Sequence, residues 1–290
     1  MLLLASFTSD PLTAQMLVET RPAHVGRGTL FQIRITPTLN TIVTGVEGRI
    51  AGEPLHFLPG DGLGWESVAA APLSGGDSLP IMIVLVHGEG RDTINTQIGV
   101  GRPEFPVERL TVAPGLAEPD RAAERRVARD NALARRVSRR AHQTPRLWTD
   151  GFLLPRPSRI TSAFGTTRQY NGAVVSRHLG TDFAGAIGDP VRATNNGRVA
   201  LVANFYLAGK VIYLDHGDGL ISAYFHLSQA LVRPGQLVKR GEVIGRVGGS
   251  GRVTGPHLHW VMRYGATTVD PMSVVSLLGE ATMGQDSGEP

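Results

Sequence analysis

Two short histidine motifs in the second half of the chain could together build a metal site. The first is an HxxxD motif formed by His178 and Asp182, and the second is an HxH motif formed by His257 and His259. Residues two apart in an extended strand point the same way, so His257 and His259 would share one face. Zn²⁺ takes nitrogen and oxygen ligands in a tetrahedron, and a catalytic site keeps one position for water. One HxH imidazole, His178 and Asp182 would bind the metal, and the other imidazole would face the water.

Either motif alone is typical of a surface or hydrogen-bonded histidine, and only their joint occurrence among glycine-rich turns favours a metal site. A metal-activated water needs no serine or cysteine nucleophile. The chain has no cysteine, which excludes disulfides, cysteine-rich zinc modules and cysteine nucleophiles. Three histidines of the first half, His24, His56 and His87, have no ligand spacing and are interpreted as structural or surface residues.

A series of further short motifs surrounds the histidines between Trp148 and Pro271. In chain order they include Phe164-Gly165, Gly188-Asp189-Pro190-Val191, Gly197-Arg198-Val199, Asp215-His216-Gly217, Tyr224-Phe225-His226-Leu227, Gly241-Glu242-Val243-Ile244-Gly245 and Thr254-Gly255-Pro256-His257-Leu258-His259-Trp260. Together with the HxxxD motif, this series closely resembles the LytM/lysostaphin-type zinc endopeptidases, the M23 family of peptidoglycan hydrolases. The resemblance covers less than half of the chain and is specific within that span.

The resemblance implies a role for each of five residues. His178, Asp182 and His259 match the ligands of one Zn²⁺ per chain. His226 and His257 match the two histidines that do not bind the metal but flank the water, which they would orient and deprotonate. Some LytM-domain proteins lack zinc ligands and activate other hydrolases, whereas every one of these positions is filled here.

Two further residues in the matched span, Tyr170 and His216, also have counterparts in the family. Tyr170 precedes the HxxxD motif in a loop where some members carry a tyrosine that stabilises the oxyanion, and a packed loop aromatic is an equal interpretation. His216 matches a family position at a turn and is interpreted as structural.

The elements that must position these residues are mostly short strands. The chain carries 36 Gly and 19 Pro, an excess of turn residues that favours many short strands. The sequence predicts a mainly β protein in five parts. These are an export-signal remnant or disordered segment (1–15), an immunoglobulin-like β-sandwich (16–114), an Arg-rich helical linker (115–146), an antiparallel β LytM/M23 domain (147–278) and a disordered tail (279–290).

The best local signals come from two strands and one helix. The segment 31–36 alternates apolar and polar residues, and 81–86 is a continuous apolar run, as in a buried strand. The segment 120–142 has no glycine or proline, begins with Asp120 as N-cap and carries a thin apolar stripe. Its eight arginines against three acidic residues give it a net charge of +5, while the rest of the chain sums to −1. The arginines form either a solvated face or a strip that meets an anionic polymer.

The sequence therefore predicts a zinc metalloendopeptidase that hydrolyses peptide bonds in peptidoglycan stem peptides or cross-bridges. The alternative is a non-catalytic LytM-fold protein that activates or docks other cell-wall hydrolases. The localised basic charge argues against a nucleic-acid partner, and no stretch approaches the ~20 apolar residues of a membrane span. The expected location is extracytoplasmic, in the periplasm or cell envelope of a bacterium. The N-terminal domain would offer a surface for a regulatory protein.

Overall fold

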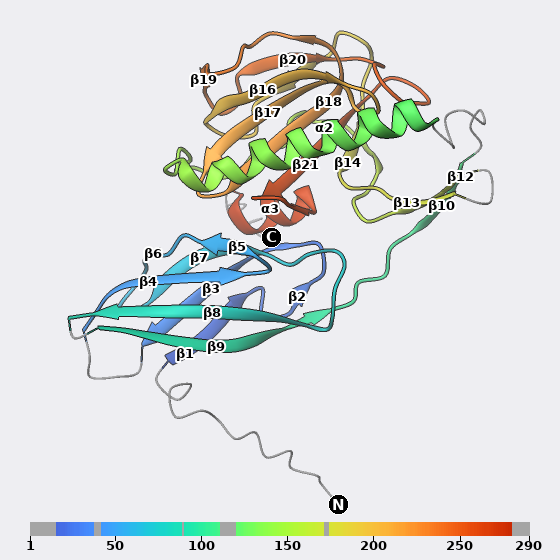
Figure 1. Cartoon of the computed structure of the whole chain (residues 1–290). Coiled ribbons are helices and arrows are strands. Elements are labelled where there is room, and N and C mark those ends of the chain that lie inside the picture. Colours follow the sequence, from blue (N-terminus) through green and yellow to red (C-terminus); the bar gives the residue numbers. More distant parts are fainter. Residues whose placement is uncertain (1–15, 38–41, 89, 111–119, 171–173, 280–290) are drawn as a thin grey trace, which may run out of the picture. The chain divides into compact units, whose positions relative to one another are not determined.

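The chain folds into two compact units that are mainly β. The computed structural model describes residues 16–37, 42–88, 90–110, 120–170 and 174–279. The first unit is Met1–Pro103 and the second is Glu104–Pro290 (Figure 1). The expected signal remnant at 1–15 and the tail beyond Gly279 lie outside the described residues. Among the described helices, none is long and apolar enough to cross a membrane.

Two sheets build the first unit. Its strands are β1 (Met16–Arg21), β2 (Val25–Gly26), β3 (Leu30–Pro37), β4 (Val43–Ile50), β5 (Glu53–Leu55), β6 (Leu58–Pro59), β7 (Trp65–Ala70), β8 (Ser78–His87) and β9 (Gly90–Gly101). One sheet has the order β1-β3-β7-β6 and the other β2-β9-β8-β4-β5. Side chains of both sheets, such as Phe31 and Ile83, share one apolar core, as expected for a β-sandwich.

The two strands predicted in this unit are confirmed. In β3, the apolar residues Phe31, Ile33 and Ile35 are fully buried, while the polar residues between them are partly exposed. In β8, the run that begins at Ile81 is mostly buried. Alternation and continuous burial therefore place these strands correctly, because a strand can bury only the face that carries its apolar residues.

A large antiparallel sheet dominates the second unit. The elements of this unit are β10 (Val107–Leu110), α2 (Arg121–Arg140), η2 (Ala141–Gln143), β11 (Ile160–Ser162), β12 (Thr167–Tyr170), β13 (Val174–Arg177), β14 (Thr181–Ala184), β15 (Pro190–Arg192), β16 (Gly197–Phe205), β17 (Gly209–Gly217), β18 (Leu220–Ala230), β19 (Leu237–Val238), β20 (Val243–Val247), β21 (His257–Tyr264), β22 (Thr267–Val269) and α3 (Pro271–Leu278). The main path of the sheet is β11-β14-β21-β18-β17-β16-β19. The strand with the HxH motif, β21, thus lies between the strand with Asp182 and the long strand β18.

A small second sheet joins the segment that follows the first unit to the two strands that precede His178. Its order is β10-β12-β13. Strand β10 pairs in parallel with β12, so that Glu108 lies opposite Arg168. Because the units divide between Pro103 and Glu104, β10 belongs to the second unit.

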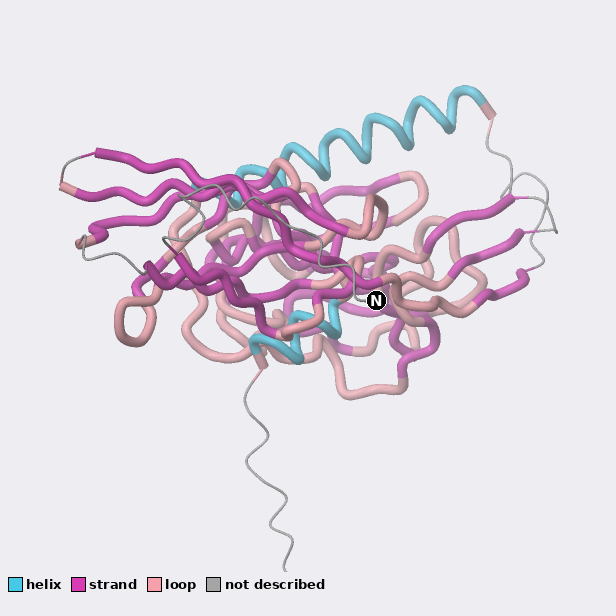
Figure 2. The backbone as a smooth tube through the Cα atoms, turned by 90° about the horizontal axis from the view of Figure 1, so that it is seen from below, coloured by secondary structure: helices cyan, strands magenta, loops and turns pink. Residues whose placement is uncertain are grey.

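The basic helix expected from the sequence is confirmed as α2, which runs beside the strands of the second unit (Figures 1 and 2). The Asp120 carboxylate accepts hydrogen bonds from the backbone N–H groups of the first turn and caps the helix. Ala134 and Val137 of the apolar stripe are buried against a cluster that includes Tyr213 and Val261 of the sheet. All eight arginines of the helix are exposed, so the helix packs with its apolar side and presents its charge to the solvent.

Candidate metal centre

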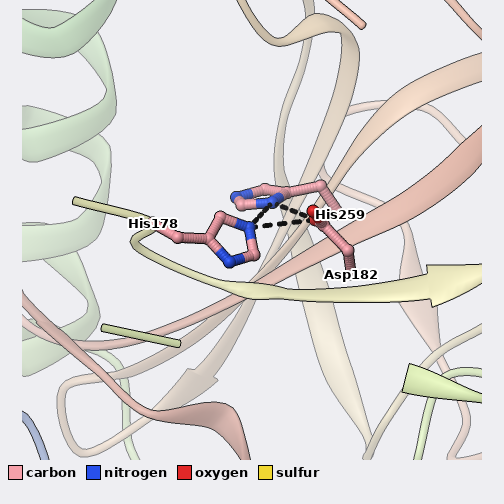
Figure 3. Close-up of side chains that lie close together, drawn as sticks. All are labelled: His178, Asp182 and His259. Atoms are coloured by element: carbon pink, nitrogen blue, oxygen red, sulfur yellow. Dashed lines mark hydrogen bonds and ion pairs between the residues drawn. The ribbon is translucent and has the colours of Figure 1, made fainter. Parts of the chain in front are cut away.

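Strand pairing brings the two histidine motifs together. In the antiparallel pair β14–β21, Asp182 lies directly opposite His259. Opposed residues on one face have Cβ atoms ~5 Å apart, which suits two ligands of one ion. His178 is four residues before Asp182 and reaches the same point from the loop that precedes β14. Figure 3 shows the three side chains turned toward one another.

The donor atoms of these three residues form a small triangle. His178 Nε2 is 3.0 Å from Asp182 Oδ1 and 3.0 Å from His259 Nδ1. His259 Nδ1 is 2.7 Å from Asp182 Oδ1. Metal bonds of ~2.0–2.1 Å in a tetrahedron place ligand atoms about 3.3 Å apart, so a small outward shift would admit an ion. Two nitrogen atoms and one oxygen atom therefore converge with their lone pairs in an arrangement that fits a zinc-sized cation.

The surroundings of His178 and Asp182 prepare both for this role. The His178 Nδ1–H donates to the Ala163 carbonyl over 2.8 Å, which leaves the Nε2 lone pair free to face Asp182. Asp182 is 5% exposed. Burial alone would raise the pKa of the Asp182 carboxyl, but the close imidazoles of His178 and His259 outweigh it and lower that pKa. The carboxyl group is therefore ionised, as a metal ligand must be.

Close packing fixes the ring of His259. Phe225, opposite His259 on β18, stacks on the ring with centroids 5.3 Å apart. On another side the ring approaches Gly180 of the HxxxD motif, where a Cβ would lie 2.7 Å from the imidazole and 2.6 Å from the Trp260 carbonyl. Only glycine fits at position 180, so the glycine in the motif is part of the site. Burial lowers the pKa of His259 and favours its neutral, ligating form.

The other two predicted histidines lie beside the triangle. His226 and His257 have ring centroids 4.9 Å apart. The His226 Nδ1–H donates to the Ser250 carbonyl and the His257 Nδ1–H to the Gly255 carbonyl, both over 2.9 Å. Each ring therefore keeps a bare Nε2, and that of His257 lies 3.7 Å from Asp182 Oδ1. Burial lowers the pKa of His226 to about 3, which favours the uncharged form.

The backbone of His226 adopts an uncommon conformation. Its φ is +60°, in the left-handed region that non-glycine residues seldom enter. A register shift in the β18–β20 pairing follows at Leu227, and the His226 N–H donates to the Ala208 carbonyl over 2.9 Å. This turn of the backbone places the imidazole at the site from within the long strand β18.

A cleft of about 770 Å³ opens over the triangle, and its lining includes His178, Asp182, His226, His257 and His259. Its walls also carry charged side chains, namely Arg159, Arg168, Arg177, Arg252 and Glu108. Four guanidinium groups against Glu108 and Asp182 make the walls net positive. The cleft therefore favours a ligand with acidic groups.

The remaining residues considered from the sequence are not part of the triangle. Tyr170 ends strand β12, but its side chain lies outside the described part of the structure. His216 is fully buried, and its Nδ1–H donates to the Asn196 carbonyl over 2.6 Å. Three residues near the site, Glu108, Ser162 and Arg168, carry no motif that sequence reasoning could have detected.

Comparisons with known proteins agree with the motifs. The model of peptidase family M23 matches residues 176–271. The peptidoglycan DD-endopeptidases ShyB and ShyA of Vibrio cholerae are 44% identical over 115 residues and 45% identical over 103 residues. These alignments cover 39% and 35% of this chain but 27% and 24% of the relatives, so the chain spans about a quarter of their length. A crystal structure from Pseudomonas aeruginosa assigned to peptidase M23 aligns with a TM-score of 0.65 and 27% identity, over 86% of this chain and 94% of that one.

Proposed function

Because residues 176–271 belong to peptidase family M23, we propose that the second unit is a zinc endopeptidase that hydrolyses peptide bonds in peptidoglycan. The observation that carries this proposal is the convergence of one ligand atom each from His178, Asp182 and His259 in one triangle. The imidazoles of His226 and His257 stand beside it. The proposal thus depends on a site with a complete donor set and on its proton acceptors, in addition to the fold.

His178 Nε2, Asp182 Oδ1 and His259 Nδ1 would hold one zinc ion per chain. When bound, zinc supplies Lewis-acid chemistry that lowers the pKa of a water and polarises a peptide carbonyl. The three residues are fixed before any ion binds, since backbone pairing, a carbonyl partner and ring stacking already determine their orientation. A rigid donor set of this kind reduces the reorganisation that metal binding requires.

His226 and His257 would transfer the proton of the attacking water. Each would direct its Nε2 to the site, because the Nδ1–H is held by a backbone carbonyl. One Nε2 would accept the proton of the attacking water, donate a hydrogen bond to the developing oxyanion and then pass the proton to the departing amine. The phenol of Tyr170 is a proposed further donor to the oxyanion.

Peptidoglycan is proposed as the substrate for two reasons. The relatives ShyA and ShyB are named as peptidoglycan DD-endopeptidases, and the cleft walls are net positive, which suits the carboxylates of stem peptides. Since peptidoglycan lies outside the cytoplasm, the protein would act in the periplasm or cell envelope. The first unit is proposed to position the substrate or to dock a regulatory protein.

The test uses the purified full chain with intact peptidoglycan sacculi. We expect about one zinc per chain by elemental analysis, loss of activity on chelation and recovery on adding zinc. Mass spectrometry of the released muropeptides would identify the bond that is cut. His178→Ala should lose both metal and activity, whereas His24→Ala, at an exposed position of the first unit, should keep both.

Two results would contradict the enzyme. A protein that stays fully active after exhaustive chelation would exclude the metal mechanism. The activator function would be supported instead if the protein binds zinc but releases no muropeptides when tested alone. Muropeptides would then appear only after a second hydrolase is added.

A further inference from the structure

The segment that follows the first unit is anchored to the second. The Phe105 ring lies so close to Gly165 that a Cβ there would come within 2.1 Å of it, and Gly165 has a φ of +81°. The Arg177 guanidinium lies over the same ring, 5.4 Å from its centroid. The Thr167 N–H donates to the Pro106 carbonyl over 2.8 Å. These contacts place strand β10 in a fixed register beside β12.

Glu108 of β10 binds two polar side chains next to the metal centre. Its Oε1 accepts a hydrogen bond from the Ser162 hydroxyl over 3.0 Å, and its Oε2 accepts one from Arg168 Nε over 3.3 Å. The Arg168 side chain is 20% exposed and that of Glu108 is 33% exposed. Pairs that are partly withdrawn from water are less screened than surface pairs, so this carboxylate constrains both partners.

Those partners in turn contact two of the three donor residues. Arg168 Nη2 donates to Asp182 Oδ2 over 2.8 Å and to Ser162 Oγ over 2.9 Å. Ser162 Oγ lies 3.3 Å from His178 Nδ1. Arg168 thereby holds one carboxylate oxygen of Asp182 on the side away from the triangle, and Oδ1 is left to face the imidazoles.

The charges at the site explain why the Arg168 guanidinium is paired with Glu108 as well as with Asp182. A guanidinium paired only with Asp182 would withdraw electron density from that ligand and would repel a nearby divalent cation. Glu108 offsets this charge and also fixes the plane of the guanidinium, because it binds Nε while Asp182 binds Nη2. The two carboxylates and the one guanidinium leave the negative charge that a cation site needs.

We propose that Glu108, Arg168 and Ser162 form a positioning network. The network orients Asp182 and His178 for zinc binding, so strand β10 contributes to the metal site through Glu108. This inference rests on the proposed function, since it takes Asp182 and His178 as zinc ligands. Partners that hydrogen-bond to metal ligands typically contribute 10–100-fold to metal affinity. All three network residues lie outside the segment 176–271 that matches the family.

The test measures the zinc affinity of the full chain by competition with a chromogenic chelator. Arg168→Gln should weaken zinc binding about 10–100-fold, and Glu108→Gln should weaken it several-fold. The double variant should bind zinc about as weakly as Arg168→Gln alone, because Glu108 acts mainly through Arg168. The matched controls Glu104→Gln and Arg109→Gln remove the same charges at exposed positions of the same segment and should leave the affinity unchanged.

The visible absorption spectrum of the Co²⁺-loaded protein is a measurement that a general loss of stability would not change. The spectrum reports ligand geometry, and we expect it to change in Arg168→Gln and not in Arg109→Gln. Arg168→Lys should restore the affinity only in part, since an ammonium lacks the planar fork that spans both carboxylates.

The outcomes separate the two proposals. If wild type binds zinc tightly and both Arg168→Gln and Glu108→Gln match it in affinity and cobalt spectrum, the positioning network is refuted and the enzyme proposal stands. Equal weakening in the Arg109→Gln control would also refute the network, because any loss of charge would then suffice. If the wild type itself binds no zinc, both proposals fail.

Discussion

The stability of the second unit should fall on mild acidification because of one buried histidine. His216 is fully buried, its Nε2 lies 2.8 Å from Ser222 Oγ, and the Phe152 ring packs against it with centroids 5.2 Å apart. Burial lowers the pKa of His216 from 6.5 to about 4. The folded protein therefore resists a proton that the unfolded chain accepts readily.

The size of the effect follows from this difference in pKa. Each tenfold change in proton affinity is worth ~1.4 kcal/mol, so a fall from 6.5 to about 4 corresponds to about 3 kcal/mol. The folded pKa lies below the unfolded one, so His216 costs no stability above about pH 6.5. The free energy of unfolding is then lost progressively as the pH falls toward 4, with about 2 kcal/mol of the loss between pH 7 and pH 5.

The assay is urea unfolding of the metal-free full chain at both pH values. His216→Asn can still donate to the Asn196 carbonyl but does not titrate in this range. The variant should be less stable than wild type at pH 7, and the gap should shrink by about 2 kcal/mol at pH 5. The control His24→Gln, at an exposed site of the first unit, should leave the pH dependence of the second unit as in wild type. A gap of equal size at both pH values would refute the reasoning.

Other perturbations test the site and the helix. Gly180→Ala should abolish zinc binding, because its Cβ would meet the His259 ring at 2.7 Å; normal zinc content of the purified variant would disprove this. His257→Ala should keep zinc but lose on the order of 10²-fold in kcat, measured on a soluble peptide; loss of zinc would mean that His257 is a ligand. Replacing four of the eight exposed arginines of α2 with glutamine should weaken sedimentation with sacculi at low salt only, and unchanged sedimentation would assign the arginines to a solvated face.

The shared face of the two HxH imidazoles could be predicted because it depends on local periodicity. An HxH motif in a strand must place both imidazoles on one face, and β21 does so. The partner of that strand could not be derived from spacing, yet the opposition of Asp182 and His259 in β14–β21 is what closes the triangle. Here the resemblance to a family supplied what local rules lacked.

The residues around the triangle show where sequence reasoning ends. Strand β10 is four residues long and pairs in parallel with a strand about sixty positions away, which no local signal specifies. Glu108 and Arg168 are ordinary charged residues until that pairing sets them opposite each other. Helix α2 was predictable from its N-cap and stripe, but the strands that receive its apolar side are determined by the tertiary fold.

The left-handed backbone at His226 limits which residue types are tolerated at that position. Apart from glycine, the residues that tolerate a positive φ best are histidine, asparagine and aspartate. For most other residues this conformation lowers the stability by ~1–2 kcal/mol. Of the three tolerant residue types, only histidine can anchor one ring nitrogen on the Ser250 carbonyl and leave a second as a base. Most substitutions here will therefore remove the imidazole and lower the stability together, and His226→Asn is the substitution that removes the imidazole at the least cost to the backbone.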